Sequence, residues 1–237
     1  MEVESLYREP ERKQIEWGAL EFVDVFKIYR SGPAETVALR GLDLRVEPRE
    51  LVAVFGPSGS GKSTMLHLAA ALDVPSAGDV RAFGEPLSRL DEGELDEYRG
   101  RKVALVFQSG NLWPALTAQE NVVLSLRLAR VARATEEAEN ALAAFGLAHT
   151  RGRRAGVLSG GEQERVAIAA AAARKARLVL ADEPTAELDE GNEELVLNAL
   201  HRLRDAFGST VVVVTHSQRI ADSADRVVEL HDGRAAS

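Results

Sequence analysis

The chain has 237 residues, of which 45% are hydrophobic, so it is long enough to bury a core in one large or two small domains. Its 37 acidic residues outnumber the 29 Lys and Arg residues, and the net charge of -8 argues against a nucleic-acid partner, which selects for basic surfaces. The absence of cysteine excludes disulfides, thiolate metal sites and cysteine nucleophiles.

The N-terminus shows no secretory signal, since MEVESLYREPERKQIEWG is charged where a signal peptide needs an apolar run. Residues 1–18 are expected to form a solvated tail ahead of a domain at 19–237. A transmembrane helix needs about 18 consecutive apolar residues. The longest apolar stretch, Val166 to Ala173, ends at Arg174, so the chain is expected to act at a membrane only through a partner.

Several short segments are predicted to form strands. The alternation of apolar and polar residues from Leu42 to Val46 predicts a half-exposed strand, antiparallel and near an edge. Uninterrupted apolar runs indicate strands that are buried on both faces, as in a parallel sheet covered by helices. These runs lie at 51–55, 103–107, 178–181 and 211–214.

Helical patterns fall between the predicted strands, over 62–72, 135–145 and 193–206. In the second of these, apolar residues recur three and four positions apart, as on one face of a helix. Residues 109–157 show helical patterns and no strong strand. The sequence therefore predicts an α/β core with a helical insert.

The stretch GPSGSGKST fits the pattern G-x-x-x-x-G-K-[ST] at Gly56, Gly61, Lys62 and Ser63, after a predicted strand and before a predicted helix. Glycines in such a loop let backbone N–H groups point at phosphate oxygens. The lysine reaches the β- and γ-phosphates, and the serine hydroxyl binds Mg²⁺. The sequence therefore predicts a site for a nucleoside triphosphate and Mg²⁺.

Polar residues follow the buried runs. Asp182 and Glu183 come after 178–181, Gln108 after 103–107, and His216 after 211–214. Ligands bind at the carboxyl edge of open α/β sheets. We interpret Asp182 and Gln108 as groups that reach Mg²⁺ or its water. Glu183 can polarise the attacking water, and His216 can donate a hydrogen bond to the γ-phosphate.

Taken in order, the phosphate loop, Gln108, LSGGE at 158–162, LVLADEP at 178–184, Asp189 and His216 resemble the ATP-binding-cassette ATPases. The segment NLWPALTAQENV at 111–122 is similar to that of cassettes for macrolide export, lipoprotein release and cell division. The resemblance implies a P-loop NTPase core with a mainly parallel sheet, an antiparallel β subdomain and a helical subdomain at about 109–160.

The resemblance also implies residue roles. Tyr29 would stack on adenine, Glu183 would be the general base, and His216 the γ-phosphate switch. Gln108 would be catalytic and would couple the site to a permease. The implied nucleotide-binding residues are Tyr29, Gly56, Ser58, Gly59, Ser60, Gly61, Lys62, Ser63, Thr64, Ser159, Gly160, Gly161 and Asp189. The implied metal ligands are Ser63, Gln108 and Asp182.

The family resemblance implies partners as well. Two cassettes, expected to be identical, would sandwich ATP head to tail, with Ser159 and Gly161 of one chain on the γ-phosphate held by the other. Asp189 would be a cross-dimer contact. A permease on a separate chain would place this cytoplasmic subunit at the inner face of the cell membrane. Trp113, with the apolar residues around it, either floors a groove for a permease helix or is simply core.

Alternative functions remain open from the sequence. The first is the ATP-hydrolysing subunit of a transporter of the macrolide-export or lipoprotein-release type. The second is a cassette that drives a cell-wall hydrolase or division complex through a membrane partner. The third is a soluble cassette of the iron–sulfur-assembly type. Nothing in the sequence names a transported substrate or a direction of transport.

Overall fold

The computed structural model describes residues 17–31, 34–186 and 188–236; most of the predicted tail lies outside these ranges. The strands are β1 Leu20–Ser31, β2 Ala34–Val46, β3 Leu51–Phe55, β4 Ala77–Ala82, β5 Glu85–Pro86, β6 Val103–Val106, β7 Leu178–Asp182, β8 Thr210–Thr215, β9 Arg226–His231 and β10 Arg234–Ala235. The α-helices are α1 Lys62–Ala69, α2 Glu92–Glu97, α3 Ala118–Leu128, α4 Ala134–Ala144, α5 Gly160–Ala173, α6 Glu190–Asp205 and α7 Gln218–Ser223. In the part of the chain that is described, no helix is long and apolar enough to cross a membrane.

The smaller sheet is antiparallel, with strand order β2-β1-β4-β5. The edge strand predicted from Leu42 to Val46 forms the second half of β2, and the rest of β2 extends it toward the N-terminus. Its apolar side chains are buried, whereas Asp43 and Arg45 are exposed. The prediction of a half-exposed antiparallel edge strand is therefore confirmed.

The larger sheet has the order β10-β9-β3-β8-β7-β6, and its strands are parallel apart from β10. All four apolar runs of the sequence are strands of this sheet. The run at 103–107 is one residue too long, because β6 ends at Val106 and Phe107 is 41% exposed. The predicted α/β class with a mainly parallel sheet is confirmed.

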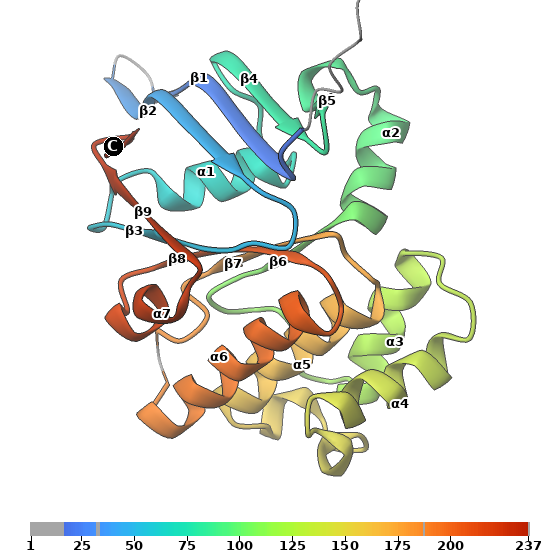
Figure 1. Ribbon diagram of the computed structural model, residues 1–237. Coiled ribbons are helices and arrows are strands. Elements are labelled where there is room, and N and C mark those ends of the chain that lie inside the picture. The colour runs from blue at the N-terminus through green and yellow to red at the C-terminus, as the bar shows by residue number, and fades with distance from the viewer. Residues whose placement is uncertain (1–16, 32–33, 187, 237) are drawn as a thin grey trace, which may run out of the picture.

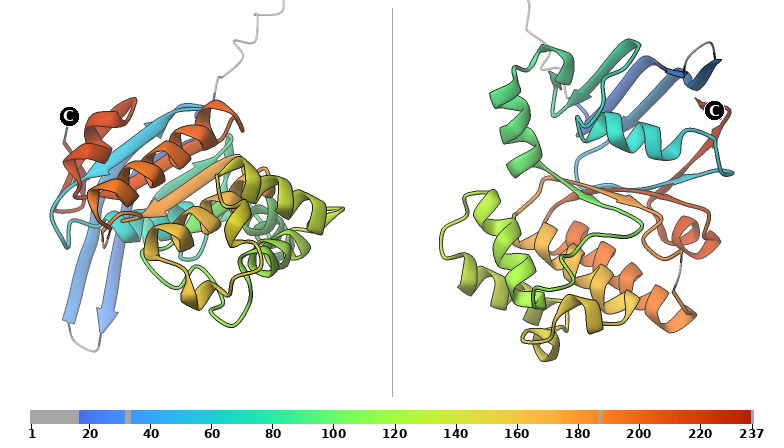
Figure 2. Two further views of the ribbon diagram at one scale, coloured as in Figure 1. Left: turned by 90° about the horizontal axis from the view of Figure 1, so that it is seen from below. Right: turned by 180° about the vertical axis from the view of Figure 1, so that it is seen from behind.

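The layers explain why these strands are apolar throughout (Figure 1). Helix α1 lies between the antiparallel sheet and one face of the parallel sheet, while α5 and α6 cover the other face (Figures 1 and 2). Side chains of β3 alternate between the two cores: Val52 and Val54 pack on the α1 side, and Leu51 and Ala53 on the opposite side. A strand buried on both faces has no position for a polar side chain.

Helices α3, α4 and α5 form the connection between β6 and β7. Helix α3 begins with a capping box in which Thr117 and Glu120 exchange side-chain and backbone hydrogen bonds. Helix α5 begins with the same device, formed by Ser159 and Glu162. The α3–α4 pair lies beside α5, away from the antiparallel sheet (Figure 1).

The phosphate loop packs against the carboxyl end of β9. A Cβ atom built on Gly56 would lie 2.2 Å from the Leu230 carbonyl oxygen and 3.0 Å from Ser60 Oγ. The first distance is far below van der Waals contact, so a side chain at this position would force the loop and β9 apart. Only glycine permits this approach.

We therefore expect Gly56→Ala to lower both the free energy of unfolding and the affinity for ATP, because either β9 or the loop must move. Gly152→Ala is the matched control, since a Cβ there meets no atom within 4 Å. Urea denaturation and equilibrium binding of ATP measure the two effects. Equal behaviour of the two variants would contradict the close-packed interpretation of Gly56.

Candidate nucleotide-binding site

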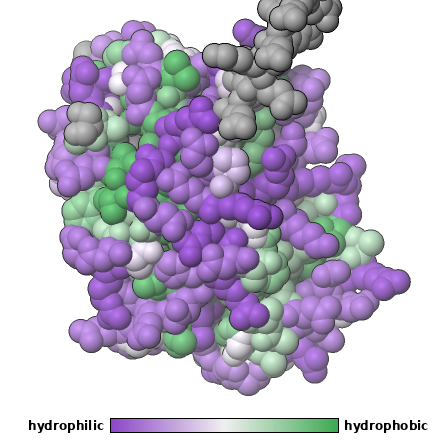
Figure 3. Space-filling model, viewed as in Figure 1, coloured by the Kyte–Doolittle hydropathy of each residue, from purple (hydrophilic) through white to green (hydrophobic). Residues whose placement is uncertain are grey.

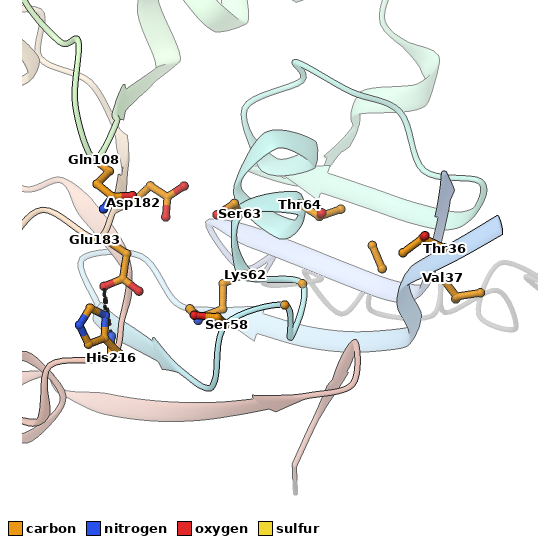
Figure 4. Close-up of a pocket in the computed structure, with 13 residues that line it drawn as sticks. Thr36, Val37, Ser58, Lys62, Ser63, Thr64, Gln108, Asp182, Glu183 and His216 are labelled. Atoms are coloured by element: carbon orange, nitrogen blue, oxygen red, sulfur yellow. Dashed lines mark hydrogen bonds and ion pairs between the residues drawn. The ribbon is translucent and has the colours of Figure 1, made fainter. Parts of the chain in front are cut away.

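A cavity of about 430 Å³ opens at the carboxyl edge of the parallel sheet. Its lining comes from separate parts of the chain: the phosphate loop with the start of α1, residues 36–38 of β2, and the segments that follow β6, β7 and β8. Figure 4 shows Gln108, Asp182, Glu183 and His216 on one side of it, with Lys62 and Ser63 facing them. The parallel sheet thus gathers the polar residues that the sequence placed after its apolar runs.

The phosphate loop presents main-chain donors at the first turn of α1. Gly59 and Gly61 have φ values of 81° and 102°, in the left-handed region that favours glycine. Gly61 is the N-cap of α1 and offers no side-chain oxygen to the free N–H groups of the first turn. Those groups are available to an anion, with the positive end of the helix dipole behind them.

Lys62 is held with its ammonium group inside this loop. Its Nζ donates to the carbonyl oxygens of Gly56 at 2.7 Å and of Pro57 at 3.0 Å, and the residue is only 8% exposed. An ammonium group has three donors, so one remains for a phosphate oxygen. Ser60 Oγ is also buried, and it has no hydrogen-bond partner among the described residues.

Ser63, Gln108 and Asp182 all line the cavity. Asp182 ends β7, and Gln108 lies two residues beyond the end of the neighbouring β6. The described residues include no cluster of three His, Asp or Glu side chains that would hold a metal by themselves. One carboxylate together with a hydroxyl and an amide oxygen suits Mg²⁺, which is usually bound through one or two carboxylates plus phosphates and water. The donor set therefore fits Mg²⁺ bound together with a nucleotide.

Glu183 and His216 form a pair at the ends of β7 and β8. Glu183 Oε2 lies 2.8 Å from His216 Nδ1 and also accepts the backbone N–H of His216 at 3.1 Å (Figure 4). The backbone of Glu183 has φ 48°, a left-handed conformation that is uncommon outside glycine. Its N–H donates to the Val214 carbonyl oxygen at 2.9 Å, which holds the strained residue in place.

Tyr29 lies outside the cavity lining. It sits on β1, paired in register with Thr36, which does line the cavity. Its hydroxyl donates to Asp73 Oδ2 at 3.0 Å, and Lys27 Nζ lies 4.9 Å from the ring centroid. The tyrosine is 40% exposed. It therefore stands beside the rim of the cavity.

Residues of the LSGGE motif and Asp189 also lie outside the cavity lining. They start two neighbouring helices: Ser159 caps α5 and Asp189 caps α6. A Cβ on Gly161 would lie 2.6 Å from Asn192 Oδ1, and Asn192 donates to both carboxylate oxygens of Asp189 at 2.9 Å. These hydrogen bonds, the backbone N–H of Asn192 first, lower the pKa of Asp189. The two motifs therefore form one packed unit in each chain.

The sequence did not predict that residues 36–38 line the cavity, and their side chains carry no chemical feature that would have indicated it. Glu164 was missed too. It is 7% exposed on α5, and burial raises the pKa of its carboxyl group to about 8, although Asn111 Nδ2 donates to it at 3.2 Å. A sequence signal did exist, since Glu164 lies three residues after Gly161 and four before Ile168, on the helix face that both occupy.

Trp113 is 66% exposed, so the interpretation of this residue as core is wrong. The loop that carries it runs over the surface between β6 and α3. The backbone of Trp113, and not its ring, is held by hydrogen bonds. Trp113 N donates to Asn121 Oδ1 at 2.7 Å, and Asn121 Nδ2 donates back to Trp113 O at 3.1 Å. A fixed loop thus presents the indole to solvent.

The buried Glu164 predicts a pH-dependent stability. Its carboxyl group ionises at about 8 in the fold but near 4.5 when unfolded, so the stability it contributes is lost as pH rises between those values. We expect Glu164→Gln to gain unfolding free energy relative to the unaltered chain across this window, as measured by urea denaturation. The exposed Glu194→Gln serves as control. A difference that is constant with pH would contradict the prediction.

Comparison with known proteins agrees with this geometry. The family model described as "ABC transporter" matches residues 39–186. The chain is 46% identical over 218 residues to the lipoprotein-releasing system ATP-binding protein LolD of Anaeromyxobacter dehalogenans, covering 91% of each. It is 38% identical to the macrolide export ATP-binding/permease protein MacB of Bdellovibrio bacteriovorus, covering 90% of this chain and 33% of that longer protein.

A solved structure of similar fold is the post-hydrolysis dimer of the ATP-binding cassette MJ0796 bound to ADP and phosphate. It has a TM-score of 0.84 and 38% identity, and the match covers 92% of this chain and 97% of that one. The sheet order, the phosphate loop and the ordered motifs of this chain lie within the region that these matches span. The chain therefore belongs to the ABC transporter family.

Proposed function

We propose that this chain is the ATP-binding and ATP-hydrolysing subunit of an ABC transporter, that it works with Mg²⁺, and that it drives a membrane permease on a separate chain. The observation that carries the proposal is the meeting of Lys62, Ser63, Gln108, Asp182, Glu183 and His216 at one cavity. The similar proteins named for lipoprotein release and macrolide export favour transport over the cell-division and iron–sulfur-assembly alternatives.

Binding of the triphosphate is assigned to the phosphate loop. The free N–H groups after Gly61 and the third donor of Lys62 meet phosphate oxygens. Ser58, Gly59, Ser60 and Thr64 complete the loop around them. Tyr29, beside Thr36 at the rim, is proposed to stack on adenine with the ring face that Lys27 leaves free.

Ser63, Gln108 and Asp182 would hold Mg²⁺. When bound, the ion neutralises charge on the β- and γ-phosphates. Asp182 is fixed for this role by its place at the end of β7, and Gln108 by the loop that follows β6.

Glu183 is proposed to accept a proton from the water that attacks the γ-phosphate. His216 Nδ1 holds the carboxylate at 2.8 Å, leaving the second oxygen of Glu183 to face that water. His216 is much more exposed than Glu183, with side-chain exposures of 67% and 15%. The histidine can therefore reach a γ-phosphate while the carboxylate stays partly shielded from solvent.

Hydrolysis is proposed to need two copies of the chain. Ser159, Gly160 and Gly161 lie apart from the cavity of their own chain, and the similar MJ0796 cassette is dimeric in its solved structure. Each copy would place this motif over the γ-phosphate held by the other, with Asp189 contacting the partner. ATP then stabilises the closed dimer because it binds that state better than the open one.

A permease is proposed to contact the surface around α3. Trp113 and Val157 are large and apolar yet at least 65% exposed, and their segments meet where Gly156 N donates to the Pro114 carbonyl oxygen at 3.0 Å. Leu128, at the other end of α3, is 75% exposed. Figure 3 shows hydrophobic side chains on the α3–α4 side of a mostly hydrophilic face. Such a patch marks an interaction site on a protein that otherwise presents polar groups. The subunit would then be peripheral on the cytoplasmic face of the membrane.

Glu183→Gln tests the catalytic assignment. We expect turnover to fall by about 10²–10⁴-fold, because the amide cannot accept the proton of the attacking water. Binding of ATP should persist, and light scattering should then detect a dimer in the presence of MgATP. Glu194→Gln on α6 is the matched control and should turn over normally. Near-normal hydrolysis by the Glu183 variant would exclude it as the base.

Ser159→Asp tests the proposal that the Ser159 motif lies over the γ-phosphate held by the other copy. An aspartate keeps the N-cap of α5 but repels a γ-phosphate, so turnover should fall while binding of ATP to the monomer stays unchanged. Ser159→Thr retains a hydroxyl and should keep most activity. Lys62→Ala should instead weaken binding to the monomer itself. Loss of monomer binding in Ser159→Asp as large as in Lys62→Ala would overturn the assignment of Ser159 to the partner's nucleotide.

A further inference from the structure

The loop that carries Gln108 is closed by one side chain. The Asn111 amide accepts the Phe107 N–H at Oδ1, at 2.8 Å, and donates from Nδ2 to the Phe107 carbonyl oxygen at 2.6 Å. Gln108 lies inside this closed turn and lines the nucleotide cavity. The position of Gln108 therefore depends on where Asn111 is held.

Asn111 is held by α5. Its Nδ2 also donates to Glu164 Oε2 at 3.2 Å. An amide has two donor hydrogens, and here one serves Phe107 and the other Glu164, so the donors of Asn111 are fully used. Glu164 is 93% shielded from solvent, and a carboxyl group so placed needs a hydrogen-bond partner. The contact is thus a fixed point between the loop and the helix.

The same helix presents the motif assigned to the partner's site. Glu164 lies five residues after the N-cap Ser159, about 7.5 Å along the helix axis at 1.5 Å per residue. The intervening turn is braced by the capping box and by Arg165 Nε, which donates to the Gly161 carbonyl oxygen at 3.2 Å. A shift of Glu164 therefore shifts Ser159 and Gly161 with it.

We propose that Asn111 and Glu164 are positioning residues whose hydrogen bond fixes the Gln108 loop to α5, so that Gln108 on one nucleotide sets the placement of the Ser159 motif on the partner's nucleotide. The inference rests on the proposed function and extends it within one chain. It assigns a route between the two nucleotide sites that runs through one side-chain contact, between residues that lie 53 positions apart in sequence.

The carboxyl group acts here as a neutral acceptor. With its pKa raised to about 8 by burial, Glu164 is mostly protonated at neutral pH, where glutamine has nearly the same shape and also accepts a hydrogen bond. Glu164→Gln should therefore preserve the link. Glu164→Met keeps an unbranched side chain of similar length and removes the acceptor.

A double-mutant cycle of Glu164→Met and Asn111→Ala on the 237-residue chain tests the link. We expect Glu164→Met to lower kcat about tenfold, the equivalent of one lost hydrogen bond. KM for ATP should change far less, because the phosphate loop is untouched. Glu164→Met should add nothing in the Asn111→Ala background, and Glu164→Gln should retain activity near that of the unaltered chain.

Glu21→Met is the matched control. Glu21 is also buried, at 8% exposed, and accepts a backbone N–H at 3.0 Å, but it lies on β1 in the antiparallel sheet. Its replacement should leave kcat unchanged. Thermal unfolding of every variant separates lost activity from lost folding, and Glu164→Leu replaces Glu164→Met if the latter does not fold.

Two outcomes would overturn the inference while the proposed function stands. One is an effect of Glu164→Met that persists undiminished in the Asn111→Ala background. The other is normal kcat in a folded Glu164→Met variant. Absence of MgATP hydrolysis by the unaltered chain would contradict the proposed function itself, and the link would fall with it.

Discussion

Parallel pairing of β6, β7, β8 and β3 is the constraint on which the rest of the structure depends. In this register Val106 lies opposite Ala181, and Asp182 opposite Val214, so that the strands end at a common edge. Each chain segment that leaves this edge carries polar groups, and burial of the strands on both faces prevents them from sliding. The sheet therefore determines where the cavity lies, because the ends of the strands fix the positions of the loops that line it.

Much of the parallel sheet and of the site at its edge could be predicted, because uninterrupted apolar runs are easily recognised in the sequence. A strand covered on both faces has to be apolar at every position, so the uninterrupted runs at 51–55 and 211–214 predicted buried strands. The residues that come directly after these runs could then be placed at the carboxyl edge of the sheet. The first strand, β1, could not be predicted in this way. Register shifts between Phe22 and Val25, with Asp24 at φ 47°, interrupt the alternation that would have marked it. Its pairing with β2 and β4 is what keeps it a strand.

Features that depend on distant partners could not be read from the sequence. The helix face of Glu164 could be read from its spacing to Gly161 and Ile168, but its hydrogen bond to Asn111, 53 residues away, could not. The hydroxyl of Tyr29 meets Asp73, 44 residues away, and the ring's place at the rim follows from its pairing with Thr36. Trp113 was ambiguous because tryptophans in cores and at interfaces look alike in sequence, and only the exposure of the side chain in the fold separates the two.

The contact between Gly56 and Leu230 has a consequence for how the protein is made. The segment after β9 is also joined to the phosphate loop, since Gly233 N donates to the Ser60 carbonyl oxygen at 3.0 Å, and to β2 through Arg40 N and the Gly233 carbonyl oxygen at 2.9 Å. Strand β3, which leads into the loop, pairs with β8 and β9. Both partners are translated long after the loop, and chains are synthesised from the N-terminus. A nascent chain on the ribosome therefore carries the phosphate-loop sequence well before it carries the strands and the C-terminal segment that contact the loop in the finished fold.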